Sequence, residues 1–127
     1  MKNKVIELAI KMCDKSHAPF SNYKVGASIE TTRGEIIGGC NVESSSYGLT
    51  CCAERVALFR AISEGYEKFK SLAVSTENGG MPCGACRQVI WDICKEIEVH
   101  ICNNEKRLKT INSSELLPDA FDENFLK

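Results

Sequence analysis

The apolar and polar positions along the chain predict helices that alternate with strands. Over residues 3–15 the apolar side chains recur at helical spacing with lysines between them, which is typical of an amphipathic helix. Apolar runs predict two further helices over 51–64 and 83–97, and strands are predicted over 25–29, 35–42, 72–75, 99–102 and 107–112. Strands that alternate with helices predict a layered α/β domain in which strands pair in parallel.

Glycines and capping residues refine this pattern. The stretch TTRGE predicts the turn of a hairpin, and Gly38 and Gly39 predict a bulge or a close backbone approach near the end of its second strand. Ser114 is expected to cap the short segment ELLP. The pattern contains no internal repeat or linker, so residues 1–127 are expected to form a single domain.

The charge balance narrows the range of partners. The chain carries 16 lysines and arginines against 17 aspartates and glutamates. Because the net charge is close to zero, the chain has no excess of positive charge to attract nucleic-acid phosphates. We therefore expect no nucleic acid as a partner. Lysine and glutamate interrupt the apolar positions of MKNKVIELAIKMCDK, which argues against a signal peptide or a membrane span there. We therefore expect a cytoplasmic protein with no membrane partner.

Two of the eight cysteines have the spacing of metal ligands. In a reducing compartment, cysteines indicate metal binding or burial rather than disulfides. Cys83 and Cys86 of PCGAC lie one turn apart at the start of a predicted helix, where unpaired N–H groups and the helix dipole stabilise thiolates. The pair alone does not specify a function, because redox sites and structural zinc knuckles also use CxxC.

A third thiolate is expected from CCAERVA, at the start of another predicted helix. Cys51 and Cys52 are adjacent, and adjacent helical residues point about 100° apart, so they rarely share an ion. We therefore favour three sulfurs and one water, the pattern of a catalytic zinc site, over four cysteines closed around a structural zinc. The number of cysteines allows both arrangements.

The same motif offers an acid and a base. Glu54 heads an apolar stripe at positions i+3, i+4, i+7 and i+8, which predicts a buried carboxylate. Beside a metal-bound water it could exchange protons with the water and a leaving group; alternatively, it only complements the helix dipole or a cap. Three thiolates exceed the charge of Zn²⁺ by one, and Arg55 could offset the excess by donating to the sulfurs. The alternative for Arg55 is a surface position.

The motifs NVESSSYG, CCAERVA, PCGACRQV and LLPDAF occur in an order and spacing that resemble a known family. Over essentially its full length the chain resembles the small, homotetrameric, zinc-dependent cytidine deaminases. The resemblance implies a three-layer α/β/α sandwich with a mixed five-stranded sheet. It also implies hydrolytic deamination of cytidine and deoxycytidine to uridine and deoxyuridine plus ammonia, in pyrimidine salvage, the chemistry of zinc-dependent base deaminases.

The resemblance implies roles for the residues of the metal site. Cys52, Cys83 and Cys86 match the ligands of one Zn²⁺ per subunit. Glu54 matches the residue that transfers protons during attack on C4 of cytosine, and Arg55 matches a residue taken to neutralise the thiolates.

It also implies roles in binding the nucleoside. Asn41 and Glu43 match residues that hold the ribose hydroxyls, which suits a neutral sugar because an amide and a carboxylate can bind hydroxyl groups. Tyr23 matches an aromatic position, usually Phe, near the sugar and base. Phe121 matches an aromatic that enters a neighbouring subunit's site. For both aromatics the alternative is core packing.

Self-association has a separate indication in the helix predicted over 51–64, which is apolar on nearly every face and must be buried on all sides. Either a subunit interface or a central place in the core would bury it, and the resemblance implies a homotetramer. Among the other cysteines, Cys13, Cys94 and Cys102 are expected to be buried as small apolar groups.

Three rival functions make different predictions. A structural zinc module would lose its metal with Cys51→Ala, whereas a deaminase would keep it with Cys51→Ala and lose it with Cys52→Ala. A deaminase of the blasticidin type shares the fold and the zinc motif, but NVESSSYG favours a nucleoside pocket. An RNA- or DNA-editing enzyme would act on an oligonucleotide and not on nucleosides, which the balanced charge disfavours.

Overall fold

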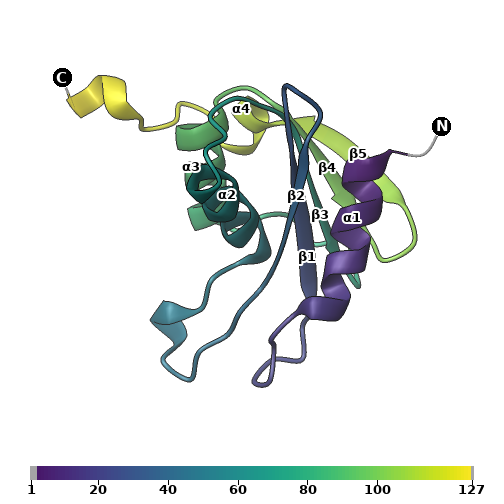
Figure 1. The fold of residues 1–127 in the computed structure, drawn as a ribbon. Helices are drawn as coiled ribbons and strands as arrows, with labels where there is room; N and C mark the ends of the chain where they lie inside the picture. Colours follow the sequence, from purple (N-terminus) through teal and green to yellow (C-terminus); the bar gives the residue numbers. More distant parts are fainter. Residues whose placement is uncertain (1–2, 127) are drawn as a thin grey trace.

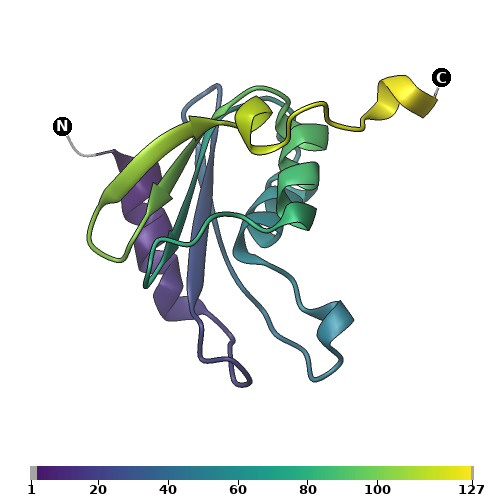
Figure 2. The same cartoon turned by 180° about the vertical axis from the view of Figure 1, so that it is seen from behind.

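A five-stranded sheet separates two layers of helices (Figures 1 and 2). The structure is a computed structural model that describes residues 3–126. Helix α1 (Lys4–Met12) lies against one face of the sheet, and α2 (Ala53–Ser63) and α3 (Gly84–Cys94) cover the other. The three-layer α/β/α arrangement implied by the resemblance is confirmed.

The sheet is mixed. Its order is β2-β1-β3-β4-β5, and the strands are β1 (Val25–Thr31), β2 (Ile36–Cys40), β3 (Phe69–Thr76), β4 (Glu98–Cys102) and β5 (Arg107–Asn112). Strands β3 and β4 pair in parallel and the other three pairs are antiparallel. The parallel pairing predicted from the alternation of elements is confirmed for β3 and β4, which flank α3, and the predicted hairpin is confirmed for β1 and β2. The prediction of parallel pairing is wrong for β1 with β3 and for β4 with β5, which are antiparallel. Short turns join β1 to β2 and β4 to β5, and such hairpins are antiparallel.

Capping and burial fix α1 on its face of the sheet. The Asn3 side chain accepts hydrogen bonds from the backbone N–H groups of Val5 (3.1 Å) and Ile6 (3.4 Å), which caps the helix. Val5 and Ala9 then pack against Ala73 of β3. A 3₁₀ turn over Cys13–Lys15 continues the helix to the predicted end of this segment.

The main core lies between the sheet and the pair α2 and α3. Its largest fully buried side chains include Ile29, Leu58, Leu72, Ile90 and Ile101. Each such side chain stabilises the fold by about 1.5–3 kcal/mol relative to an exposed position. Leu58 of α2 and Ile90 of α3 belong to this one apolar layer, which therefore holds both helices against the sheet.

Gly39 lets α2 approach β2 closely. A Cβ atom at this position would lie 2.4 Å from the backbone nitrogen of Ala57 and 2.8 Å from the carbonyl oxygen of Ala53. The predicted close approach is confirmed, but there is no bulge here, because the β1–β2 register runs without a break. The missing side chain sets the distance of α2 from the sheet.

Three details differ from the sequence predictions. Helix α4 (Ser113–Leu116) is capped by Asn112, which forms a capping box with Glu115, so Ser114 lies inside the helix rather than at its cap. Helix α3 ends at Cys94, because Lys95 has a positive φ of 57° and leaves the helical conformation. Cys94 is only half-buried, whereas Cys13 and Cys102 are buried as predicted.

Within residues 3–126, no helix has the length and apolar composition needed to cross a bilayer.

Candidate active site

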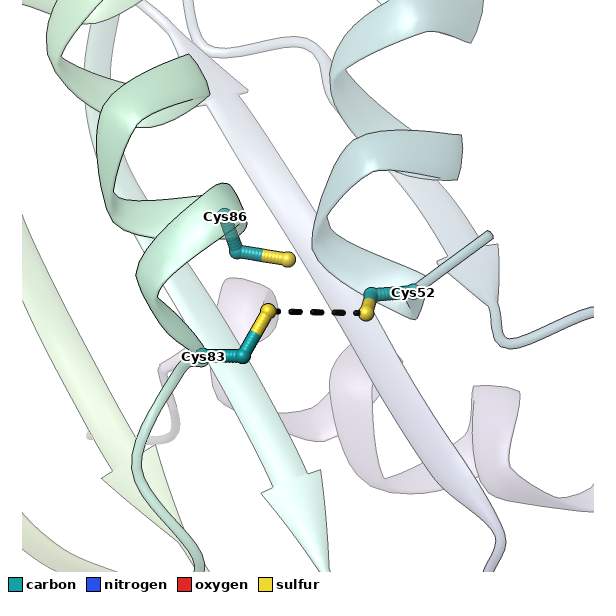
Figure 3. A group of neighbouring side chains, drawn as sticks. All are labelled: Cys52, Cys83 and Cys86. Atoms are coloured by element: carbon teal, nitrogen blue, oxygen red, sulfur yellow. Dashed lines mark hydrogen bonds between the residues drawn. The ribbon is translucent and has the colours of Figure 1, made fainter. Parts of the chain in front are cut away.

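Three thiols from two helix starts meet at one point. Cys52 is the N-cap of α2, Cys83 is the N-cap of α3, and Cys86 lies in the first turn of α3. Their sulfur atoms all lie within 4.8 Å of one another, and those of Cys52 and Cys83 are 3.8 Å apart. Figure 3 shows the three sulfurs turned toward a common space between the helices. In the part of the chain that the structure describes, this is the group that could hold a metal ion.

The local backbone leaves these sulfurs free to face one another. Cys52 and Cys83 both have extended backbone angles, and neither side chain caps its own helix. The first N–H groups of α2 and α3 are therefore directed toward the cluster, where they favour negative charge. This is the arrangement of two helix starts that the two cysteine motifs predicted.

The thiols perturb one another in a way that suits a shared cation. The hydrogen bond with Cys86 is the largest cause that lowers the pKa of Cys52, to about 5, and the same contact raises the pKa of Cys86. One thiol thus ionises at the expense of its neighbour, because adjacent thiolates repel. A divalent ion would stabilise all three thiolates together, and zinc accepts such sulfur ligands. The donor set fits zinc.

Arg55 lies beside the cluster rather than in solvent. Its Nη2 atom donates to the Cys52 sulfur at 3.3 Å, and this hydrogen bond raises the pKa of the guanidinium. Within residues 3–126, its Nε atom is buried without a hydrogen-bond partner. The side chain therefore supplies positive charge at the sulfurs, as the charge argument predicted.

Glu54 is the buried acid of the site. It is the second residue of α2, and only 4% of it is exposed. Desolvation is the main cause that raises its pKa to about 7, and the nearby charge of Cys52 acts in the same direction. A carboxyl group of this kind can hold or release a proton near neutral pH.

Cys51 does not join the cluster. Its backbone N–H and C=O both pair with Val42, at 2.9 Å each, which keeps the residue extended ahead of α2. Within residues 3–126, the possible metal ligands at this point are three sulfurs, so the closed four-cysteine arrangement is absent. A tetrahedral ion held in this way would keep one position for another ligand.

Asn41 is buried, and its side chain holds the neighbouring loop. Its Nδ2 atom donates to the Tyr23 carbonyl at 2.8 Å, while its Oδ1 atom accepts from the Val25 N–H at 3.0 Å and from the Ser16 hydroxyl. The amide therefore fixes the shape of the segment ahead of β1. Its polar atoms are mostly engaged within the chain.

Glu43 lines a cavity of about 300 Å³ together with Phe20, Ser21, Ser44, Tyr47 and Thr50. Its carboxylate accepts hydrogen bonds from the N–H groups of Phe20 (3.0 Å) and Ser21 (3.1 Å) and from the Ser21 hydroxyl. The bond with the Ser21 side chain is the main cause that lowers the pKa of Glu43. The group is thus held ionised at the cavity wall, where it can accept a further hydrogen bond.

The two predicted aromatic residues are both exposed. The Tyr23 hydroxyl donates to Asn78 Oδ1 at 2.8 Å. Phe121 is 54% exposed and stacks on Phe125 with ring centroids 5.5 Å apart. Neither ring is part of the core, so the core-packing alternative is wrong for both.

Sequence reasoning missed the polar contacts that support these residues. Ser21 holds Glu43 through its N–H and its hydroxyl, and no pattern in the sequence marks it for this role. Arg87 donates to the carbonyls of Pro82 (2.8 Å) and Leu116 (3.0 Å), which ties the start of α3 to the end of α4. Gln88 donates to the Phe121 carbonyl at 2.7 Å. Arg87 and Gln88 belong to the quoted PCGACRQV motif, which was the available signal.

A layered α/β fold that brings three thiols from two helix starts beside a buried carboxylate defines the class of zinc-binding deaminases. The chain belongs to the cytidine and deoxycytidylate deaminase family. The family described as "Cytidine and deoxycytidylate deaminase zinc-binding region" matches residues 1–101.

Individual relatives cover nearly the whole chain. A cytidine deaminase from Sporosarcina psychrophila is 41% identical over 93% of this chain and 89% of its own length. One from Halalkalibacterium halodurans is 42% identical over 92% and 91%. The crystal structure of cytidine deaminase from Burkholderia pseudomallei superposes with a TM-score of 0.90 at 45% identity, covering 95% of this chain and all of that one. A blasticidin-S deaminase from Bacillus cereus is 32% identical over 82% and 81%.

Proposed function

We propose that this chain is a zinc-dependent hydrolase that converts cytidine and deoxycytidine to uridine and deoxyuridine, with release of ammonia, in pyrimidine salvage. The observation that carries the proposal is the three-thiol cluster beside the buried carboxylate of Glu54. Membership of the cytidine and deoxycytidylate deaminase family supports the substrate.

In this proposal Cys52, Cys83 and Cys86 hold one Zn²⁺ per chain. When bound, the ion supplies a Lewis acid that makes a water molecule nucleophilic near neutral pH. Arg55 offsets the excess negative charge of three thiolates through its hydrogen bond to Cys52. The N–H groups at the starts of both helices act in the same direction.

Glu54 moves the protons. Its carboxylate is desolvated and next to the cluster, so it can accept a proton from the attacking water and deliver it to the departing amino group. Burial excludes bulk solvent, which would otherwise compete for that proton. The reaction is a hydrolysis: a C–O bond forms at C4 of cytosine, the C–N bond breaks, and ammonia leaves.

Asn41 and Glu43 form the sugar side of the proposed site. Glu43 is ionised and fixed by Phe20 and Ser21, which leaves it able to accept a hydrogen bond from a ribose hydroxyl. Asn41 contributes mainly by holding the loop in shape, because its amide already bonds to Tyr23 and Val25. Tyr23 supplies an aromatic ring near sugar and base.

We also propose that the active unit is a homotetramer in which Phe121 enters a neighbouring site. Phe121 is exposed and projects from the segment after α4. On α2, Phe59 and Ile62 are each 46% exposed, so the helix that sequence analysis expected to be buried on all sides presents an apolar face. Light scattering tests this assembly, and a monomer at working concentration would contradict it. The three proposed thiolate ligands must stay reduced to bind zinc, which supports a reducing, cytoplasmic setting.

The test of the function is cytidine turnover, followed by the loss of cytosine absorbance, with zinc content measured on the same samples. Wild type should be active, and Glu54→Gln should retain about one zinc per chain while losing activity by about 10²- to 10⁴-fold. Glu64→Gln is the matched control, because Glu64 is an exposed carboxylate at the end of α2 that pairs with Arg60. A zinc-loaded wild type that consumes blasticidin S but leaves cytidine unchanged would sink the proposal.

A further inference from the structure

The main chain around Tyr23 is fixed to the proposed sugar-binding residues. The Tyr23 carbonyl accepts from Asn41 Nδ2 at 2.8 Å, and the Tyr23 N–H donates to the Ser21 hydroxyl oxygen at 3.0 Å. Ser21 in turn donates to Glu43. The position of the Tyr23 ring is thus tied from its backbone side to both Asn41 and Glu43.

The Tyr23 hydroxyl reaches a second loop, residues 77–82, which connects β3 to the start of α3. Asn78 Oδ1 accepts from the Tyr23 hydroxyl at 2.8 Å and from the Thr76 hydroxyl at 3.3 Å. The Thr76 hydroxyl oxygen accepts from the Gly80 N–H at 2.7 Å. These bonds order the loop that leads to Cys83, five residues after Asn78.

The absence of a side chain at Gly80 leaves space for the Tyr23 hydroxyl. A Cβ atom at position 80 would lie 2.8 Å from the Tyr23 hydroxyl oxygen and 3.5 Å from Asn78 Oδ1. Residues with positive φ in this loop include Gly79 but not Gly80, so alanine at 80 would meet a steric obstacle and no backbone strain. The loop therefore has room for the hydroxyl of Tyr23 because residue 80 lacks a side chain.

We propose that the Tyr23 hydroxyl is a positioning group. Its hydrogen bond to Asn78, here called the clasp, connects the loop 16–24, which precedes β1, to the loop 77–82. The clasp thereby joins the sugar side of the site to the segment before Cys83. Because the hydroxyl donates its one hydrogen bond to Asn78, Tyr23 has no hydroxyl donor left to offer a nucleoside, and its ring remains available. The substrate in this inference rests on the proposed function, whereas the clasp itself does not.

Hydrogen exchange of the zinc-loaded protein tests the clasp without reference to activity. Backbone amides exchange when the loop opens locally, and one exposed hydrogen bond changes the equilibrium between closed and open loop by a factor of roughly two to ten. Tyr23→Phe and Asn78→Ala should each speed exchange of the peptide spanning 77–82 by about that factor, whereas Asn78→Asp keeps the acceptor oxygen and should exchange like wild type. The matched control is Tyr66→Phe, at a tyrosine that packs against the core after α2.

Gly80→Ala adds a test of the steric fit. In the wild-type background it should speed exchange of the same peptide, because its Cβ displaces the hydroxyl from Asn78. In the Tyr23→Phe background it should add less than twofold, because the atom that it would meet is gone. Additive effects of the two substitutions would overturn the proposed fit.

Kinetics then decide whether the clasp serves the site. Tyr23→Phe and Asn78→Ala should each raise the KM for cytidine by roughly two- to tenfold. Asn78→Ala also removes the acceptor of the Thr76 hydroxyl, so the double variant is compared with Asn78→Ala and should be no worse than it, because the bond to Tyr23 is already lost there. The kcat should stay within about twofold, since the hydroxyl touches no reacting atom in this proposal. Unchanged exchange in Tyr23→Phe overturns the clasp, and faster exchange with unchanged KM overturns its role at the site. If wild type does not deaminate cytidine, the proposed function fails while the exchange experiment still judges the clasp.

Discussion

Gly39 offers a sharp test of how the sheet positions the zinc-binding helices. In Gly39→Ala the new Cβ would lie 2.4 Å from the Ala57 nitrogen, and α2 would have to move by roughly 1 Å to reach an ordinary contact of 3.4 Å. Overpacking against backbone costs about 1–3 kcal/mol. At about 4 °C per kcal/mol for a chain of this size, the thermal midpoint should fall by about 4–12 °C.

The same movement should reach the metal site, because Cys52 is the N-cap of α2 while Cys83 belongs to α3. Ligand geometry tolerates only about 0.5 Å of displacement, so zinc affinity should fall by about tenfold. A competition titration with a chromogenic chelator measures it, and differential scanning calorimetry measures the midpoint.

Gly38→Ala is the matched control one residue away. Its Cβ points to the other face of the sheet, where it would meet the side chains of Met12 (2.9 Å) and Leu8 (3.3 Å). Flexible side chains can yield, so we expect a cost below about 1 kcal/mol and unchanged zinc affinity. If the two variants have equal midpoints and bind zinc equally well, the argument that Gly39 sets the position of α2 is wrong.

Three further predictions concern single side chains. Metal analysis after dialysis should find about one zinc per chain in Cys51→Ala and none in Cys52→Ala. The reverse result would favour the rival hypothesis of a structural zinc module. Arg55→Gln should keep zinc but lower the kcat for cytidine by about 10- to 100-fold, because the thiolates lose the guanidinium that donates to Cys52. An unchanged kcat would show that another group offsets the charge of the thiolates. Burial lowers the pKa of His100, so near this pKa the folded chain binds fewer protons than the unfolded chain. The free energy of unfolding, measured in urea from about pH 7 to pH 5, should therefore fall as the pH drops below about 6.5. The fall should be less steep in His100→Gln, and equal slopes in the two proteins would refute this.

The thiol cluster could be predicted from the sequence because its members lie in local motifs. A CxxC pair must share one helix turn, and CCAERVA marks a second helix start, so only the meeting of the two starts required the fold. Helix geometry argued only against a site that uses both Cys51 and Cys52, and the family resemblance assigned the ligand to Cys52; the structure adds a physical reason. Cys51 lies outside the helix, because its backbone pairs with Val42.

Other features of the site could not be read from the sequence, because they join polar groups that no periodicity connects. The bond between Tyr23 and Asn78 spans 55 residues, and the contact of Ser21 with Glu43 spans 22. The antiparallel pairing of β1 with β3 was missed for a related reason: alternation of elements does not reveal which strands become neighbours. Strand β3 lies between β1 and β4, antiparallel to one and parallel to the other.

The meeting of Cys52 and Cys83 has a consequence for the supply of this protein in a cell. These residues are 31 positions apart in the chain, and an ion that binds both closes the intervening chain into a ring. Because the two thiols meet only in the folded chain, the ion binds that state far better than the unfolded one and stabilises it by about 4 kcal/mol when free zinc is about 1,000 times its dissociation constant. Much of the stability of a small domain would then depend on the metal, so zinc starvation would lower the amount of folded protein as well as the activity of each molecule.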